Sequence, residues 1–236
     1  MIRYLFFILL FLKFFDSKAQ LLSGTELLEK AIAFHDPNGN WQSFKGSFKV
    51  TMETPNSSSR ISTIHIDLPR EEFVLDVAKD NDTYAYLIEK DSCSISLNGS
   101  SKISSEDTGR LRLSCERGTM MKDYYTYLYG LPMKLKDSGT IINSKVEKKI
   151  FKGKEYLVLK VNYAETIGKD TWYFYFDPLT YAMEVYQFYH DESKNDGEYI
   201  LLEGLETINN IKMPKTRAWY YNKDDKYLGT DILSIN

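Results

Sequence analysis

Few residues in this chain of 236 have side chains suited to catalysis or metal binding. It has three histidines, His35, His65 and His190, and two cysteines, Cys93 and Cys115. No histidine lies at ligand spacing from a cysteine, which argues against a zinc site. The serine-nucleophile patterns Gly-x-Ser-x-Gly and Ser-x-x-Lys and the metalloprotease pattern His-Glu-x-x-His do not occur. The sequence therefore predicts no metal, no cofactor and no catalytic residue.

The first nineteen residues have the layout of an export signal. Arg3 provides the charged start, Leu5–Leu12 is an apolar run, and Ser17–Ala19 offers small residues for cleavage before Gln20. An uncleaved membrane anchor is the alternative, but a spanning helix needs about 20 apolar residues and Lys13 interrupts the run early. We expect residues 1–19 to be a signal peptide and the protein to be exported, to a periplasm or an equivalent space.

Export carries the two cysteines into an oxidising compartment. Cys93 and Cys115 are then expected to form one disulfide that ties the strand after Lys90 to a central helix. Two buried free thiols are the alternative.

Charge and composition limit the classes of partner. The formal net charge is −3 and no basic block occurs, which argues against nucleic acid as a main partner. Aromatic residues make up 14% of the chain, which argues against disorder.

The periodicity of apolar residues changes along the chain. Ser23–Glu26 reads as a capping box that starts a helix, and alternation of period two follows from about Phe48 to Ile88. Asn98–Arg110 is rich in serine and charge and is expected to be a loop. Strands resume near Lys145 and continue almost to the end. The pattern predicts a mainly β (α+β) fold in one domain, residues 20–236: an open antiparallel half-barrel of about ten or eleven strands, with two or three helices as plug or lid.

A helix is expected between the two groups of strands, from Cys115 to about Tyr129. Met120, Tyr124, Tyr127, Leu128 and Leu131 recur at helical spacing on it. The stripe is consistent with ordinary core packing or with a mobile lid over the sheet.

The segment from Thr171 to His190, TWYFYFDPLTYAMEVYQFYH, is the most aromatic part of the chain. Asp177–Thr180 has the residues of a turn, so the segment is predicted to be a hairpin in which Phe176 faces Tyr181. This register places Trp172 opposite Val185 and Phe174 opposite Met183 on an apolar face. It places Tyr173 and Tyr175 on a solvated face.

The apolar faces of all these strands would meet on the concave side of the sheet. They would form either a filled core or a roofed, ligand-binding pocket. The predicted lining residues are Phe48, Val50, Met52, Ile64, Ile66, Phe73, Leu75, Val77, Trp172, Phe174, Phe176, Met183 and Val185.

The order of these elements resembles that of the lipoprotein-localisation carriers (LolA/LolB-like) of the Gram-negative envelope and their half-barrel superfamily. The residues that carry the resemblance are Asp177, Pro178 and Thr180 at the hairpin turn, and Ile211, Met213 and Pro214 in the segment INNIKMPKTRAWYY. Asn210 stands where the family usually has glycine. The resemblance implies an apolar interior that shelters acyl chains, helices that act as a lid, and no catalysis.

Three classes of function follow. The first is a binding protein for a hydrophobic ligand, an acyl chain or a lipidated protein. The second is an envelope protein-interaction module that uses a tyrosine-rich sheet face, since tyrosine is favoured at interfaces. The third is an enzyme whose carboxylates pair across strands without a sequence motif.

Overall fold

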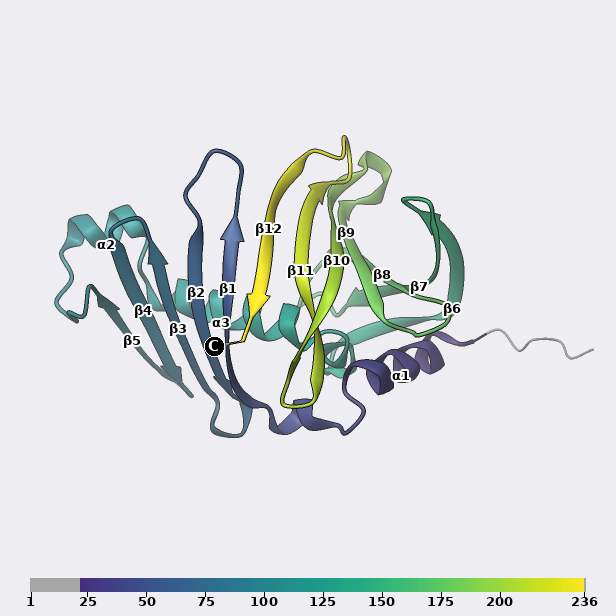
Figure 1. The fold of residues 1–236 in the computed structure, drawn as a ribbon, viewed down its shortest axis with the longest axis horizontal. Coiled ribbons are helices and arrows are strands. Elements are labelled where there is room, and N and C mark those ends of the chain that lie inside the picture. Colours follow the sequence, from purple (N-terminus) through teal and green to yellow (C-terminus); the bar gives the residue numbers. More distant parts are fainter. Residues whose placement is uncertain (1–21, 236) are drawn as a thin grey trace, which may run out of the picture.

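The computed structural model describes residues 22–235 (Figure 1). The predicted signal peptide lies outside these residues. Within them no helix is long and apolar enough to cross a membrane. The helices are α1 (Gly24–His35), α2 (Ser105–Leu111) and α3 (Cys115–Gly130). The strands are β1 (Lys45–Glu53), β2 (Arg60–Asp67), β3 (Glu72–Lys79), β4 (Asp82–Glu89), β5 (Ser92–Leu97), β6 (Thr140–Phe151), β7 (Lys154–Tyr163), β8 (Thr171–Phe176), β9 (Met183–Asp191), β10 (Asp196–Ile208), β11 (Ile211–Tyr221) and β12 (Tyr227–Ser234).

All twelve strands form one antiparallel sheet in the order β5-β4-β3-β2-β1-β12-β11-β10-β9-β8-β7-β6. Strands β5 and β6 are the free edges, so the sheet curls without closing (Figure 1). The predicted open half-barrel is confirmed, with β5 bringing the strands to twelve. Pairing of β1 with β12 joins the first and the last strand in the middle of the sheet.

Helix α1 packs against one end of the β6–β11 part of the sheet (Figure 1). Its predicted capping box is present, because Ser23 Oγ accepts from the Glu26 amide and the Glu26 carboxylate accepts from the Ser23 amide. Leu27, Leu28 and Ala31 form its buried stripe. The pattern of local signals therefore predicted this element well.

The segment expected to be a loop, Asn98–Arg110, contains most of α2. Ser104 caps this short helix by accepting from the Asp107 amide. Arg110 then binds Asp82 of β4, with Nη1 and Oδ2 2.5 Å apart. The expectation was wrong because a cap and a long-range ion pair support a helix that has no buried residue of its own.

The register of the aromatic hairpin differs from the predicted one. Tyr175 pairs with Val185 and Phe176 with Met183, so Glu184 is the extra residue of a β-bulge. Lys154 binds the Glu184 carboxylate at 2.6 Å and holds the bulge. The turn is also longer than predicted, since β9 begins only at Met183.

The bulge changes which residues share a face. Trp172 now lies opposite Phe188, and Phe174 lies opposite Tyr186. Val185 belongs to the opposite, convex face, so its predicted place beside Trp172 is wrong. Met183 stays with Phe174 on the concave side.

The two outer tyrosines are not solvated as predicted. Tyr173 is 8% exposed and Tyr175 is 4% exposed, because the twisted sheet buries them in a second apolar cluster with Tyr156, Val158 and Val185. The Lys149 Nζ atom lies 4.4 Å from the centre of the Tyr173 ring and covers it further.

Candidate ligand-binding site

The concave face of the sheet carries most of the predicted lining residues. Their apolar character follows from the alternation of each strand, and cross-strand pairing aligns them in rows such as Phe48, Ile64 and Leu75. The residues that lie in this cluster are Phe48, Val50, Ile64, Ile66, Phe73, Leu75, Val77, Phe174, Phe176 and Met183, with Trp172 packed against it. Met52 pairs in the same sheet and lines a small cavity at one end.

Helix α3 fills the middle of the concavity (Figure 1). Its buried residues include Met121, Tyr125, Leu128 and Tyr129. The Tyr129 ring centre lies 4.8 Å from that of Phe48, which is contact distance for two aromatic rings. In this conformation the rings beneath α3 are therefore packed and closed to solvent.

The buried stripe of α3 differs in phase from the predicted one. Met120 is 51% exposed, whereas its neighbour Met121 is buried. Tyr124 and Tyr127 are partly buried and pack at the borders of the cluster. The helix is thus rotated so that Tyr125 and Tyr129 face the sheet, which places glycine at position 118 against the Tyr86 ring.

Tyrosine hydroxyls join α3 to both halves of the sheet. Tyr125 donates to Ser62 on β2 at 2.9 Å, and Tyr124 donates to Asp231 on β12 at 3.4 Å. On the other side the hydroxyl of Tyr127 is hydrogen-bonded to that of Tyr163 on β7. A few polar contacts and a layer of rings therefore hold the helix in place.

A disulfide attaches the N-terminal end of α3 to the edge of the sheet. Cys93 on β5 and Cys115 at the first turn of α3 are bonded, with their Cα atoms 5.9 Å apart. The predicted pairing is present. Because the link lies at one end of the helix only, the other end has no covalent attachment to the sheet.

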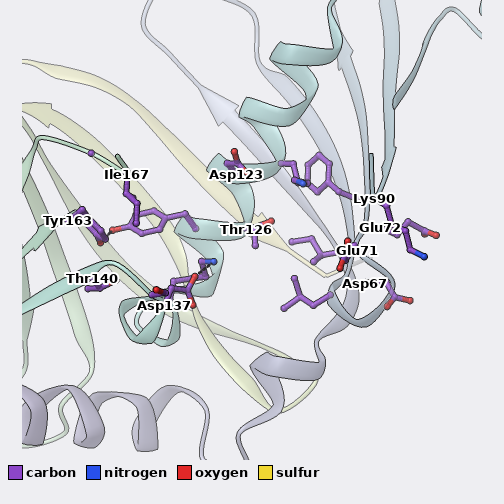
Figure 2. Close-up of a pocket in the computed structure, with 18 of the residues that line it drawn as sticks. Asp67, Glu71, Glu72, Lys90, Asp123, Thr126, Asp137, Thr140, Tyr163 and Ile167 are labelled. Atoms are coloured by element: carbon purple, nitrogen blue, oxygen red, sulfur yellow. Dashed lines mark hydrogen bonds and ion pairs between the residues drawn. The ribbon is translucent and has the colours of Figure 1, made fainter. Parts of the chain in front are cut away.

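A cavity of about 700 Å³ opens beside α3 on the concave side (Figure 2). The predicted residues Ile66, Phe73 and Trp172 contribute to its apolar part. Tyr127 lies in its wall. Tyr163 lies there too (Figure 2). Its size falls within the range of small-molecule sites, about 300–1,000 Å³. Only these three of the predicted lining residues reach this cavity.

The rim of this cavity is charged. Asp67, Glu71, Glu72, Lys90 and Asp123 stand around it (Figure 2). Lys45 lies 3.0 Å from Asp67, and its hydrogen bond holds the pKa of that carboxyl below its usual range. A charged rim around an apolar interior suits a ligand with one polar end, which stays at the rim, and one apolar end, which enters the cavity.

A buried polar group that no sequence motif indicated lies beneath the C-terminal half of α3. Arg217 on β11 has no exposed surface, and it donates to the carbonyl oxygens of Pro214 at 2.8 Å and of Leu128 at 3.4 Å. Asp231 on β12 is 3% exposed, and it lies directly opposite Arg217 in the register of β11 and β12. Alternate residues of a strand share a face, so position 217 lies on the same face as Ile211 and Met213. This alternation in the sequence indicates that Arg217 faces the apolar side of the sheet.

The histidines of the chain lie outside this site or serve the fold. His35 is fully buried, and its Nδ1 donates to the Lys212 carbonyl oxygen at 2.6 Å while its Nε2 accepts from the Met183 amide at 2.9 Å. Burial lowers the pKa of His35 to about 4. The neutral ring satisfies two backbone groups, one on β9 and one on β11.

Comparison with known proteins places the chain in a family. The model of the family described as "Family of unknown function (DUF6503)" matches residues 3–236. The chain belongs to DUF6503. A search among curated proteins gave no match to this DUF6503 member.

A solved structure with a TM-score above 0.5 shares the fold of this DUF6503 chain, and a second matches with a lower TM-score. The LolA superfamily protein NE2245 from Nitrosomonas europaea has a TM-score of 0.52 and 11% identity, covering 91% of this chain and 92% of its own. A putative outer membrane lipoprotein-sorting protein domain from Vibrio parahaemolyticus has a TM-score of 0.46 and 10% identity, covering 88% and 91%. The predicted resemblance to the LolA superfamily is confirmed at the level of the fold.

Proposed function

We propose that this protein is a non-catalytic binding protein whose interior shelters the acyl chain of a lipid or of a lipidated protein. The observation that carries the proposal is an apolar concave face whose middle is covered by α3, beside a cavity of about 700 Å³. The fold shared with a LolA superfamily protein supports it. The ligand-lining residues are those of the concave cluster, led by Ile66, Phe73 and Trp172 at the cavity and extending beneath α3.

Helix α3 acts as the lid in this proposal. Its contact with the sheet consists mainly of aromatic rings, which separate without breaking covalent bonds, and of a few hydroxyl hydrogen bonds. The Cys93–Cys115 link keeps the N-terminal end in place, so the end near Tyr129 is the one that moves. Displacement of that end would join the closed apolar face to the open cavity.

We further propose that the protein acts after export. The signal-like segment of residues 1–19 supports this location, as does a disulfide, which persists in oxidising compartments. The intact mass of the protein recovered from the periplasm is expected to correspond to a chain that begins at Gln20. A mass that retains residues 1–19 would identify the segment as an anchor.

Native mass spectrometry of the purified protein, before and after delipidation, tests the function. Acyl-chain binding predicts hydrophobic adducts that delipidation removes and that added palmitate restores. A displacement assay with a fluorescent fatty-acid probe supplies the affinity. Absence of adducts together with no probe binding would contradict the proposal. An interaction module would then be expected to co-purify with a protein partner instead.

A further inference from the structure

Four residues form a row across the concave face. Arg60, Met52, Asp231 and Arg217 lie directly opposite one another on the consecutive strands β2, β1, β12 and β11. Neighbouring strands are about 4.8 Å apart, so Asp231 lies about 5 Å from the Arg217 backbone and about 10 Å from that of Arg60. Two cations and one carboxylate therefore share one strip of the otherwise apolar interior.

The charges of this row do not balance. An arginine stays protonated in proteins, so Asp231 can neutralise only one of the two guanidinium groups. Burial raises the pKa of Asp231, and Arg217 and Arg60 oppose that shift. Arg217 is fully buried and Arg60 is partly buried, so the surplus positive charge of the row favours one additional negative charge nearby.

Buried hydrogen-bond donors without partners within residues 22–235 lie at both ends of the row, the Arg60 Nε at one end and a group of three at the Arg217 end. The Nε of Arg217, the hydroxyl of Tyr129 and the hydroxyl of Tyr186 are buried and have no hydrogen-bond partner within residues 22–235. The guanidinium carbon lies 3.9 Å from the Tyr129 ring centre. Tyr186 on β9 lies in one cross-strand row with Ile200 and Trp219, and its ring centre is 6.2 Å from that of Trp219. Trp219 is two positions from Arg217 on β11, so Tyr186 lies on the same part of the concave face.

A small cavity lies beside the middle of the row. Its volume is about 230 Å³, and its wall includes Met52, Tyr124, Glu198, Trp219 and Asp231. Two of these residues, Met52 and Asp231, are members of the row itself. Arg217, Tyr129 and Tyr186 are fully buried and do not line this cavity, so a ligand reaches them only when α3 moves away from the sheet.

We propose that Arg217, Tyr129 and Tyr186 form a head-group subsite for an anion, so that the ligand is an acyl chain ending in a carboxylate or a phosphate. The inference rests on the proposed acyl-chain binding and adds its chemical class. A carboxylate or phosphate accepts several hydrogen bonds at once and pairs well with guanidinium. The acyl chain lies along the concave face beneath α3, and Arg60 supplies a second positive charge along the row.

Three probes that have the same hydrocarbon tail but different head groups test the class of head group. Palmitate, cetyl phosphate and cetyl alcohol are titrated into the delipidated protein by displacement of a fluorescent fatty-acid probe. At least one anionic probe is expected to bind about tenfold or more tightly than the alcohol. The preferred anion identifies the head group as carboxylate or phosphate. Equal affinity for all three would overturn the head-group proposal and leave acyl-chain binding intact, whereas no binding of any probe would contradict the proposed function itself.

Variants locate the subsite. Tyr186→Phe and Tyr129→Phe remove hydroxyls that have no partner, so both proteins are expected to fold, and each is expected to lose about threefold to tenfold in affinity for the anionic probe only. Tyr86→Phe is the matched control, because its hydroxyl is equally buried and unpartnered within residues 22–235 but lies on β4 against α3 at Gly118. Arg217→Gln is expected to abolish the preference for the anion. An unchanged preference for the anionic probe over the alcohol in the folded variants would overturn the proposal. If Arg217→Gln does not fold, the affinities of Tyr186→Phe and Tyr129→Phe for the anionic probe provide the test.

Discussion

The guanidinium carbon of Arg217 lies 3.9 Å from the centre of the Tyr129 ring, so a buried cation of β11 contacts the last turn of α3. The same side chain donates to the carbonyl oxygen of Leu128 in that turn. The contact is a cation–π interaction combined with a weak hydrogen bond, and both end when the helix moves by a few ångströms. The sheet and its covering helix therefore meet through contacts that are specific but separable.

Loosening of α3 should be measurable at its C-terminal half. Tyr163→Phe removes the β7 hydroxyl that is hydrogen-bonded to Tyr127. We expect amide hydrogen exchange between Asp123 and Gly130 to become about fivefold faster, because a lost hydrogen bond costs about 1 kcal/mol. Tyr227→Phe is the control, since its hydroxyl bonds only Thr230. Equal exchange in the two variants would argue against α3 as a lid.

Truncation of Phe174 should destabilise the fold strongly. Its ring has no exposed surface and stacks on Trp172, with the centres 6.0 Å apart. Phe174→Ala is therefore expected to lower the free energy of unfolding by about 3–5 kcal/mol in urea titrations. Leu179→Ala in the same hairpin, at a side chain 87% exposed, should change it by less than about 0.5 kcal/mol. A small effect at Phe174 would mean that the concave face is open in solution.

The disulfide should contribute measurably to stability. Cys93 and Cys115 are 22 residues apart, and closing such a loop in the unfolded chain stabilises the fold by about 3 kcal/mol in the chain-entropy model. The double variant Cys93→Ser/Cys115→Ser should therefore unfold at lower urea concentration than the oxidised wild type. Adding dithiothreitol should bring the wild type to the variant's midpoint and leave the variant unchanged. Coincident curves without reductant would contradict the expectation.

Acid should destabilise the protein through His35. Its pKa is about 4 in the folded state and 6.5 without burial, so the unfolded chain takes up a proton that the folded protein does not. The stabilisation is complete above pH 6.5 and is lost as the pH falls toward 4, by about 3 kcal/mol in total.

Urea unfolding at several pH values in this window tests the histidine. His35→Gln should lower stability at neutral pH, because the ring bridges Lys212 and Met183, and should remove most of the pH dependence. His190→Gln, on the surface beside Asp170, should retain the wild-type loss in acid. A wild-type slope in His35→Gln would show that another group causes the acid loss.

Local patterns account for what could be predicted. The capping box at Ser23–Glu26 and the alternation around Phe48 and Ile64 are properties of neighbouring residues, so they determined α1 and the first strands without knowledge of the rest. The predicted export signal and the count of two cysteines likewise led to the expected pairing of Cys93 with Cys115. An antiparallel sheet of this length has few ways to bury one face, which made the half-barrel predictable.

Only the tertiary structure decided the hairpin register and the state of the concave face. The bulge at Glu184 depends on Lys154, a residue of another strand, and it moves Val185 to the convex side. Whether α3 fills or roofs the concavity depends on its rotation, which places Met121 rather than Met120 against the sheet.

The row of Arg60, Asp231 and Arg217 likewise has one determinant that is local in the sequence and one that depends on the tertiary structure. Alternation along each strand determines that these side chains share the concave face with apolar neighbours. Their alignment arises only when β1 pairs with β12 and brings together residues far apart in the sequence. Pairing between distant strands depends on the packing of the whole sheet, so no local window of the sequence encodes it.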